Sequence, residues 1–163
     1  MTEPLEHRIS RLLEKRRLTL ALAESCTGGL VSHRLTNVPG ISRFLKCAIV
    51  AYSNDAKRRL LGVPVSLIRR HGAVSAEVAA AMASGALEAG RAQVALGITG
   101  IAGPAGGTKR KPVGLVYVGI ATSRAAFARE FRFGGGRTAV KSKSATAALR
   151  LLLQCLEQTT WQN

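Results

Sequence analysis

The sequence is short of aromatic, cysteine, histidine and acidic residues, and these shortages exclude several classes of protein. One Trp, two Tyr and four Phe in 163 residues are too few to stack many nucleic-acid bases, and no aromatic signature of an RNA-recognition sheet is present. The three cysteines are an odd number without paired spacing, which argues against a disulfide framework and a zinc site. We therefore expect a metal-free protein of a reducing cytoplasm.

Long apolar runs are also missing. The longest, around residues 18–23 and 113–121, fall short of the roughly 20 residues that cross a bilayer, and the first four residues do not resemble a signal peptide. Neither export nor membrane insertion is expected. A chain that is 47% apolar, with no repeat or linker, is expected to form one domain over residues 1–163.

Positive charge is abundant, since 24 Lys and Arg against 9 Asp and Glu give a formal net charge of +15. Taken alone, this balance indicates a nucleic-acid partner or another polyanion. The basic residues are spread over the whole chain rather than gathered in one motif. We therefore interpret most of the charge as a solvated surface, which would still raise the local concentration of a phosphate-bearing substrate.

Apolar periodicity, cap residues and turn residues predict helices and strands in alternation. Asn54 or Asp55 is expected to cap the third helix, and Ser75 the fifth. The predicted helices cover residues 4–17, 30–38, 57–61, 64–71, 76–90 and 138–158, and the predicted strands cover residues 18–23, 48–52, 94–98, 115–122 and 126–133.

This order of elements predicts an α/β fold, a three-layer α/β/α sandwich with a mixed, mostly parallel five-stranded sheet. The connection Ser123-Arg124 is short enough for the last two strands to form an antiparallel hairpin. The loops at 24–29, 52–57 and 99–107 each follow a predicted strand, and sites in such sheets gather at strand ends. We expect these loops to meet in one cleft.

Residues 23–29, Ala-Glu-Ser-Cys-Thr-Gly-Gly, place Ser25 between a strand and a helix. Backbone amides at the helix start, near Thr27, Gly28 and Gly29, can hold an anion or the oxyanion of an acyl-transfer intermediate. Ser25 is thus a candidate nucleophile. Ser25 or Thr27 can instead cap the helix, and the loop alone favours that interpretation. Cys26 is a rival nucleophile without an evident histidine to activate it.

A serine nucleophile needs a base. His7 and His33 lie in predicted helices and His71 precedes a turn, none beside an acidic partner in a strand-end loop, so a Ser-His-Asp triad is not expected. Lys57 is the next candidate, because a desolvated lysine can serve as a base while Tyr52 relays or orients the proton. A surface lysine and a half-buried tyrosine are the alternative, which the residues alone favour.

Two glycine-rich segments are further candidate anion sites. The loop that begins at Thr99 and Gly100 lacks the lysine and hydroxyl ending of a Walker loop, so hydrolysis of a nucleoside triphosphate is not implied. Its backbone amides can still approach a phosphate or a carboxamide. Three glycines at 134–136 precede Arg137, which can clamp a phosphate bidentately.

Six motifs in this order resemble the CinA C-terminal domain family, over roughly residues 8–157. They are Ala-Glu-Ser-Cys-Thr-Gly-Gly (23–29), Tyr-Ser-Asn-Asp-Ala-Lys (52–57), Leu-Gly-Val (61–63), Gly-Ala-Val-Ser (72–75), Thr-Gly-Ile-Ala-Gly-Pro (99–104) and Lys-Pro-Val-Gly (111–114). Characterised members deamidate nicotinamide mononucleotide to nicotinate mononucleotide and ammonia, without a metal or organic cofactor, in pyridine nucleotide salvage. The resemblance implies the same activity here.

The family's catalytic serine, tyrosine and lysine correspond to Ser25, Tyr52 and Lys57, and its substrate-binding threonine corresponds to Thr99. The loops described above add further substrate-binding candidates, namely Thr27, Gly28, Gly29, Gly100 and Arg137. The chain departs from the family in the glycine run, where an acidic residue commonly stands beside the arginine, and at Lys141, where an arginine is frequent. These departures affect the phosphate end of the expected site.

Larger family members carry an N-terminal domain that resembles molybdopterin-binding proteins. This sequence shows no such domain, so it resembles the stand-alone form of the family. A homodimer is the default expectation. Two alternatives stay open. One is a non-catalytic competence- or damage-inducible module that binds nucleic acid or a nucleotide, and the other is a hydrolase of a different small amide.

Overall fold

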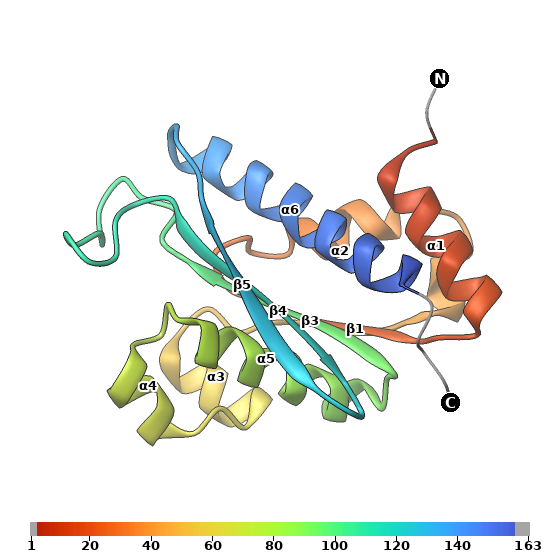
Figure 1. Ribbon diagram of the computed structural model, residues 1–163, viewed down its shortest axis with the longest axis horizontal. Helices are drawn as coiled ribbons and strands as arrows, with labels where there is room; N and C mark the ends of the chain where they lie inside the picture. The colour runs from red at the N-terminus through yellow and green to blue at the C-terminus, as the bar shows by residue number, and fades with distance from the viewer. Residues whose placement is uncertain (1–2, 159–163) are drawn as a thin grey trace.

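The computed structural model describes residues 3–158, and every helix and strand expected from the sequence is present there (Figure 1). The helices are α1 (Leu5–Arg16), α2 (Leu30–Thr36), α3 (Asn54–Leu61), α4 (Val65–His71), α5 (Ala76–Gly90) and α6 (Arg137–Glu157), with a short 3-10 turn, η1 (Ile41–Arg43), that the sequence did not predict. The strands are β1 (Leu20–Glu24), β2 (Leu45–Val50), β3 (Val94–Gly100), β4 (Leu115–Thr122) and β5 (Ala126–Arg132).

The five strands form one sheet in the order β2-β1-β3-β4-β5. The central strand β1 pairs in parallel with β2 and β3, whereas β4 pairs antiparallel with both β3 and β5. Only β4 therefore runs against the other strands. The predicted α/β fold with a mixed, mostly parallel sheet and a terminal hairpin is confirmed.

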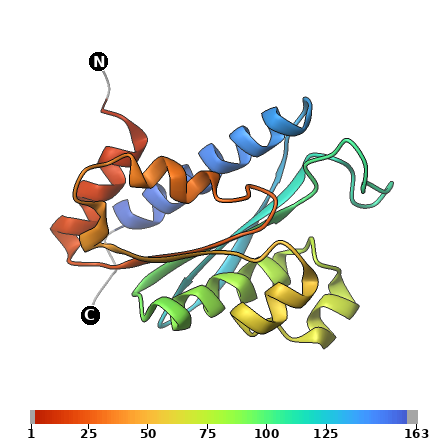
Figure 2. The ribbon, with the colours of Figure 1, turned by 180° about the vertical axis from the view of Figure 1, so that it is seen from behind.

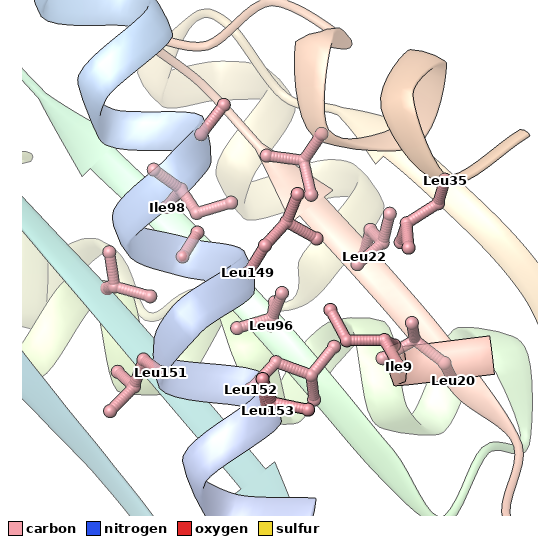
Figure 3. Close-up of a cluster of buried hydrophobic side chains, with 14 of the residues drawn as sticks. Ile9, Leu20, Leu22, Leu35, Leu96, Ile98, Leu149, Leu151, Leu152 and Leu153 are labelled. Atoms are coloured by element: carbon pink, nitrogen blue, oxygen red, sulfur yellow. The ribbon is translucent and has the colours of Figure 1, made fainter. Parts of the chain in front are cut away.

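Helices cover both faces of the sheet, as Figures 1 and 2 show from opposite sides, with α1, α2 and α6 on one face and α3, α4 and α5 on the other. Alternate side chains of β1 supply the two cores: Leu20 and Leu22 join α1 and α6, while Ala21 and Ala23 join α5. In Figure 3, Leu149 of α6 packs over this first core. None of the helices within residues 3–158 is long and apolar enough to cross a membrane.

Helix α5 lies unusually close to the sheet because two strands present glycine beneath it. A Cβ atom built on Gly97 of β3 would lie 2.3 Å from the carbonyl oxygen of Ala79, and one on Gly119 of β4 would meet the same oxygen at 2.3 Å. Any larger residue at either position would push α5 away. The close approach sets the distance of α5 from the sheet.

Several element boundaries differ from the sequence prediction. Strand β2 begins three residues earlier than expected and ends at Val50. Exposed and partly buried residues alternate along it, as in an edge strand, so a polar residue such as Lys46 is tolerated within the strand. Tyr52 therefore lies in the loop and not in the strand. Strand β3 continues through Thr99 and Gly100, which the sequence assigned to a loop.

The cap of α3 also differs from the prediction. The Oγ atom of Ser53 accepts the backbone N–H of Ala56 at 3.0 Å, so the expectation of a cap at Asn54 or Asp55 is wrong by one position or two. Ser75 caps α5 as predicted, because its Oγ atom accepts the N–H of Val78 at 3.3 Å.

Candidate active site

The ends of three parallel strands meet at one end of the sheet. Strands β1, β2 and β3 run in the same direction, so the loops that follow Glu24, Val50 and Gly100 lie side by side. Hydrogen bonds join these loops across large sequence separations. The three loops therefore meet at one end of the sheet as expected, while the cavity described below borders only the first of them.

Ser25 and Lys57 are in direct contact at this end of the sheet. The Nζ atom of Lys57 lies 3.0 Å from the Oγ atom of Ser25, and it lies 3.1 Å from the carbonyl oxygen of Ala51 and 3.4 Å from that of Tyr52. Ser25 is 7% exposed and Lys57 is 2% exposed. The amine is thus enclosed by three oxygen atoms and has almost no access to water.

Burial changes the chemistry of Lys57. Removal from water disfavours the charged form and lowers the pKa of Lys57 below its ordinary value. No carboxylate hydrogen-bonds to this amine among residues 3–158. Lys57 is therefore not the surface lysine of the alternative interpretation, and it has the environment of a lysine that can act as a base.

Glu24 organises the helix start that follows Ser25, a role that the sequence analysis missed. Its buried carboxylate accepts the hydroxyl of Thr27 at 2.7 Å and the backbone N–H groups of Gly29, Val31 and Ser32 at 2.8–3.1 Å. A negative charge at this place also complements the dipole of α2. An acidic residue just before a glycine-led helix start was the available signal.

This carboxylate excludes the cap interpretation of Ser25 and Thr27. The N-cap residue of α2 is Gly29, which has no side chain that could cap the helix. The hydroxyl of Thr27 donates to Glu24 instead. Gly28 and Gly29 adopt φ values of +60° and +95°, which favour glycine. The two glycines therefore allow a tight turn shortly after Ser25, and the hydroxyl of Ser25 contacts Lys57.

Cys26 is not equipped to be the nucleophile. Its side chain is buried, and burial raises the pKa of the Cys26 thiol to about 12. Only a thiolate is a strong nucleophile, so this thiol is inert near neutral pH. Its sulfur packs close to Gly100, where an added Cβ would come within 3.0 Å of it. Cys26 thus fills space between β1 and β3.

Tyr52 and Arg137, which the sequence analysis placed in different roles, form a hydrogen bond with each other. The guanidinium of Arg137 donates to the Tyr52 hydroxyl at 2.6 Å and to the carbonyl oxygen of Gly103 at 2.7 Å. Arg137 thereby joins the start of α6 to the loops after β2 and β3. The Tyr52 side chain is 57% exposed, and it is its main-chain carbonyl, not its phenol, that contacts Lys57.

Thr99 lies beside the site and has a structural partner. Its buried hydroxyl donates to the carbonyl oxygen of Ala73 at 2.8 Å. Lys111, from the glycine-rich loop, donates to the carbonyl oxygens of His71 and, at 2.7 Å, Val74. Together they tie the turn before α5 to the end of β3. Gly100 is confined by Val116, Leu115 and Cys26.

A cavity of about 510 Å³ opens next to the Ser25 loop, between the starts of α2 and α6. Its cations are Lys141 and, when protonated, His33, and no carboxylate lines it. The Nζ atom of Lys141 lies 3.6 Å from the place where a Cβ of Gly28 would stand. The cavity is lined by Thr27, Gly28, Gly29, Leu30, His33, Thr138, Lys141 and Ser142.

Within the described residues no histidine hydrogen-bonds to Ser25, although His33 lines the neighbouring cavity. His71 pairs instead with Glu77, at 3.2 Å between Nδ1 and Oε1, and the hydroxyl of Ser25 has Lys57 as its side-chain partner. Within residues 3–158, no group of three or more His, Cys, Asp or Glu side chains is placed to hold a metal ion.

The chain is similar to known proteins in sequence and in fold. The family model described as the CinA C-terminal domain matches residues 2–156. A CinA-like protein of Geobacter sulfurreducens is 49% identical over 141 residues, which are 86% of this chain and 34% of that protein. A CinA-like protein of Citrifermentans bemidjiense is 49% identical over 154 residues, 94% of this chain and 37% of that protein. The chain spans about a third of the length of these curated relatives.

Solved structures match over nearly their full length. The competence damage-inducible protein A of Klebsiella pneumoniae superposes with a TM-score of 0.91 at 32% identity, covering 97% of both chains. The competence/damage inducible protein CihA of Agrobacterium tumefaciens has a TM-score of 0.86 at 38% identity, covering 97% of this chain and 99% of the other. The fold and the sequence therefore point to the same set of proteins.

Proposed function

This chain belongs to the CinA C-terminal domain family, and from that premise we propose that it deamidates nicotinamide mononucleotide to nicotinate mononucleotide and ammonia. The observation that carries the proposal is the buried contact between Lys57 and Ser25. A buried amine that no carboxylate neutralises is unfavourable for stability. Its burial is explained if the amine accepts the proton of a serine during catalysis.

The three neighbours of the Lys57 amine suit a neutral base. A neutral amine has two N–H donors and one lone pair, so it can donate to the carbonyl oxygens of Ala51 and Tyr52 while the lone pair accepts the Ser25 proton. The two carbonyl groups thus direct the lone pair to the hydroxyl. This arrangement activates the serine without a histidine.

The proposed reaction proceeds by an acyl-enzyme. Ser25 Oγ bonds to the carboxamide carbon as its proton passes to Lys57, and Lys57 then protonates the nitrogen so that ammonia leaves. A water molecule, deprotonated by Lys57, attacks the ester carbon, and the proton returned to Ser25 releases nicotinate mononucleotide. One water is consumed for each ammonia formed.

Hydrogen bonds within the loop limit which backbone N–H groups can stabilise the oxyanion. The N–H of Gly28 is donated to the carbonyl of Ser25 at 3.0 Å, and that of Gly29 is donated to Glu24. The N–H groups of Cys26 and Thr27 donate to no other residue within the described part of the chain. We assign oxyanion stabilisation to these two amides, which directly follow the nucleophile.

The cavity beside the loop is suited to the ribose phosphate of the substrate. Lys141 and the start of α6 bring positive charge to it, and the start of a long helix favours a phosphate. Arg137 stands at the same helix start with donors left over after its bonds to Tyr52 and Gly103. We propose that Tyr52 positions two residues, Arg137 through its phenol oxygen and Lys57 through its main-chain carbonyl oxygen.

An ammonia-release assay tests the proposal. The protein is incubated with nicotinamide mononucleotide, nicotinamide riboside or nicotinamide, and the Ser25→Ala variant is run in parallel to measure contaminating hydrolases. We expect release that is fastest with the mononucleotide and absent from the variant. Folded protein that releases no ammonia from any of the three would refute the proposed hydrolysis of nicotinamide mononucleotide. Equal rates with riboside and mononucleotide would show that the phosphate is not recognised.

A non-catalytic module that binds nucleic acid is the rival from another class, and the net charge of +15 favours it. A nucleic-acid-binding function does not explain why a buried lysine contacts a buried serine. Retention on DNA that falls with salt and that nicotinamide mononucleotide displaces, without ammonia release, would support the rival. Ammonia release without DNA binding would exclude it.

A further inference from the structure

A second cavity, of about 420 Å³, lies on another side of α6 from the Ser25 loop, between that helix and the edge strand β5. Ser142 lines both cavities, so they adjoin along α6, and their other lining residues differ. We call the second cavity the β5/α6 groove. It is lined by Arg129, Phe131, Phe133, Ser142, Lys143, Thr146, Ala147, Arg150, Leu151 and Gln154.

The groove is built from one face of a strand and one flank of a helix. Arg129, Phe131 and the following Phe133 alternate along β5 and its end, so their side chains project from the same face. On α6, Lys143, Ala147, Arg150 and Gln154 recur every three or four residues and share one flank. The neighbouring stripe of α6, which includes Ala148 and Leu149, is buried in the core.

Two aromatic rings form the apolar surface of the groove. The rings of Phe131 and Phe133 lie with centroids 5.9 Å apart and planes only 9° from parallel. Both side chains are partly exposed where they pack against the core. The two rings are stacked face to face, so a further planar ring can extend the stack on an outer face.

Three cations surround these rings, and no carboxylate lines the groove. Arg129 donates to the amide oxygen of Gln154 at 3.1 Å, and Lys143 donates to the carbonyl oxygen of Gly134 at 2.7 Å, so both are held in place while keeping their charge. Arg150 makes no hydrogen bond or ion pair within residues 3–158. Other surface arginines are paired with acids, among them Arg8, Arg11, Arg43, Arg58 and Arg132.

We propose that the β5/α6 groove is a second binding site, which takes a nucleoside monophosphate with its base on the two phenylalanines and its phosphate on the cations. An aromatic stack beside unneutralised positive charge complements a planar ring that carries an anion, and a cavity of this size suits one small ligand. The site is distinct from the Ser25 cleft and does not depend on the proposed amidohydrolase activity.

Calorimetric titration of the whole protein with adenosine 5′-monophosphate, adenosine or inorganic phosphate tests the site. We expect the monophosphate to bind at least tenfold more tightly than either half alone. Arg150→Glu, at an exposed position, and Phe131→Leu, which keeps an apolar side chain but removes the ring, should each weaken binding at least tenfold. Lys46→Glu changes the net charge as much as Arg150→Glu but lies on the opposite edge strand, β2, and should leave binding unchanged.

Four outcomes would overturn the site. Unchanged affinity in Arg150→Glu would exclude the groove, and equal loss in Lys46→Glu would assign binding to the overall charge. Loss in Arg137→Ala with no loss in Arg150→Glu would place the ligand in the Ser25 cleft. A change of molecular mass by light scattering in Arg150→Glu, without nucleotide binding by the unmodified protein, would make the groove an interface between copies. Ammonia release by Arg150→Glu should equal that of the unmodified protein, so this test and that of the proposed function fail separately.

Discussion

The amine of Lys57 and the hydroxyl of Ser25 lie 3.0 Å apart although the two residues stand 32 positions apart in the sequence. Their contact is made where the ends of β1 and β2 lie side by side, and both side chains are buried. The amine is the only side-chain group that hydrogen-bonds to this hydroxyl within residues 3–158.

Removal of either member of the pair should abolish amide hydrolysis. Ser25→Ala and Lys57→Ala should each lower kcat/KM for nicotinamide mononucleotide at least about a hundredfold, because loss of a nucleophile or base removes transition-state stabilisation. Ammonia release measures the effect, and circular dichroism checks the fold. Folded variants that keep near-normal turnover would show that the pair does not carry the chemistry.

The rate should rise with pH. Lysine acts as a base only when it is neutral, and burial lowers the pKa of Lys57, so the neutral form becomes available below the roughly 10.4 of an exposed lysine. We expect kcat/KM to increase about tenfold per pH unit below the midpoint and then to level off. Lys57→Arg, which stays charged, should be inactive at every pH. A rate that falls over the same range would contradict a lysine base.

Glu24 should matter more for stability than an exposed glutamate. Glu24→Gln replaces an acceptor of four hydrogen bonds with a group that has a single acceptor oxygen, and should destabilise the fold by about 3 kcal/mol. Glu14→Gln, whose carboxylate pairs with Arg43 at the surface, is the matched control and should change stability by less than about 1 kcal/mol. Urea denaturation measures both, and equal effects would refute the role of Glu24.

Arg137 should act on the substrate's phosphate. Arg137→Ala should raise KM for the mononucleotide about tenfold to a hundredfold, the loss expected for a hydrogen bond to a charged group, and should change hydrolysis of the riboside much less. Arg59→Ala, on the surface of α3 beside Asp55, serves as control and should leave both substrates unchanged. An equal loss with mononucleotide and riboside would assign Arg137 a purely structural role between Tyr52 and Gly103.

Cys26 should be unreactive in the native protein. A buried thiol with a pKa of about 12 forms almost no thiolate near neutral pH. Iodoacetamide should therefore leave Cys26 unmodified by mass spectrometry until the protein is denatured, and Cys26→Ala should keep its activity within about threefold. A loss in Cys26→Ala as large as that in Ser25→Ala would identify the thiol as the nucleophile.

Much of the fold follows from local sequence pattern. The apolar positions of α1 and α6 recur at helical spacing, and the short apolar runs at β1 and β3 are those of strands covered on both faces, so the elements and their layers are predictable. The edge strand β2 was displaced in the prediction because it mixes polar and apolar residues in the manner of a half-exposed strand. Its boundary depends on pairing with β1, which no local pattern records.

The sequence by itself determined the order of helices and strands, the three strand-end loops and the motifs that mark the family. The tertiary structure decided which groups of those loops are in contact. It buried Lys57 against Ser25, replaced the expected hydroxyl cap with the Glu24 carboxylate, and joined Tyr52 to Arg137. The physical reason is that helix and strand formation depend on neighbours along the chain, whereas desolvation and hydrogen bonding at a site depend on which distant segments pack around it.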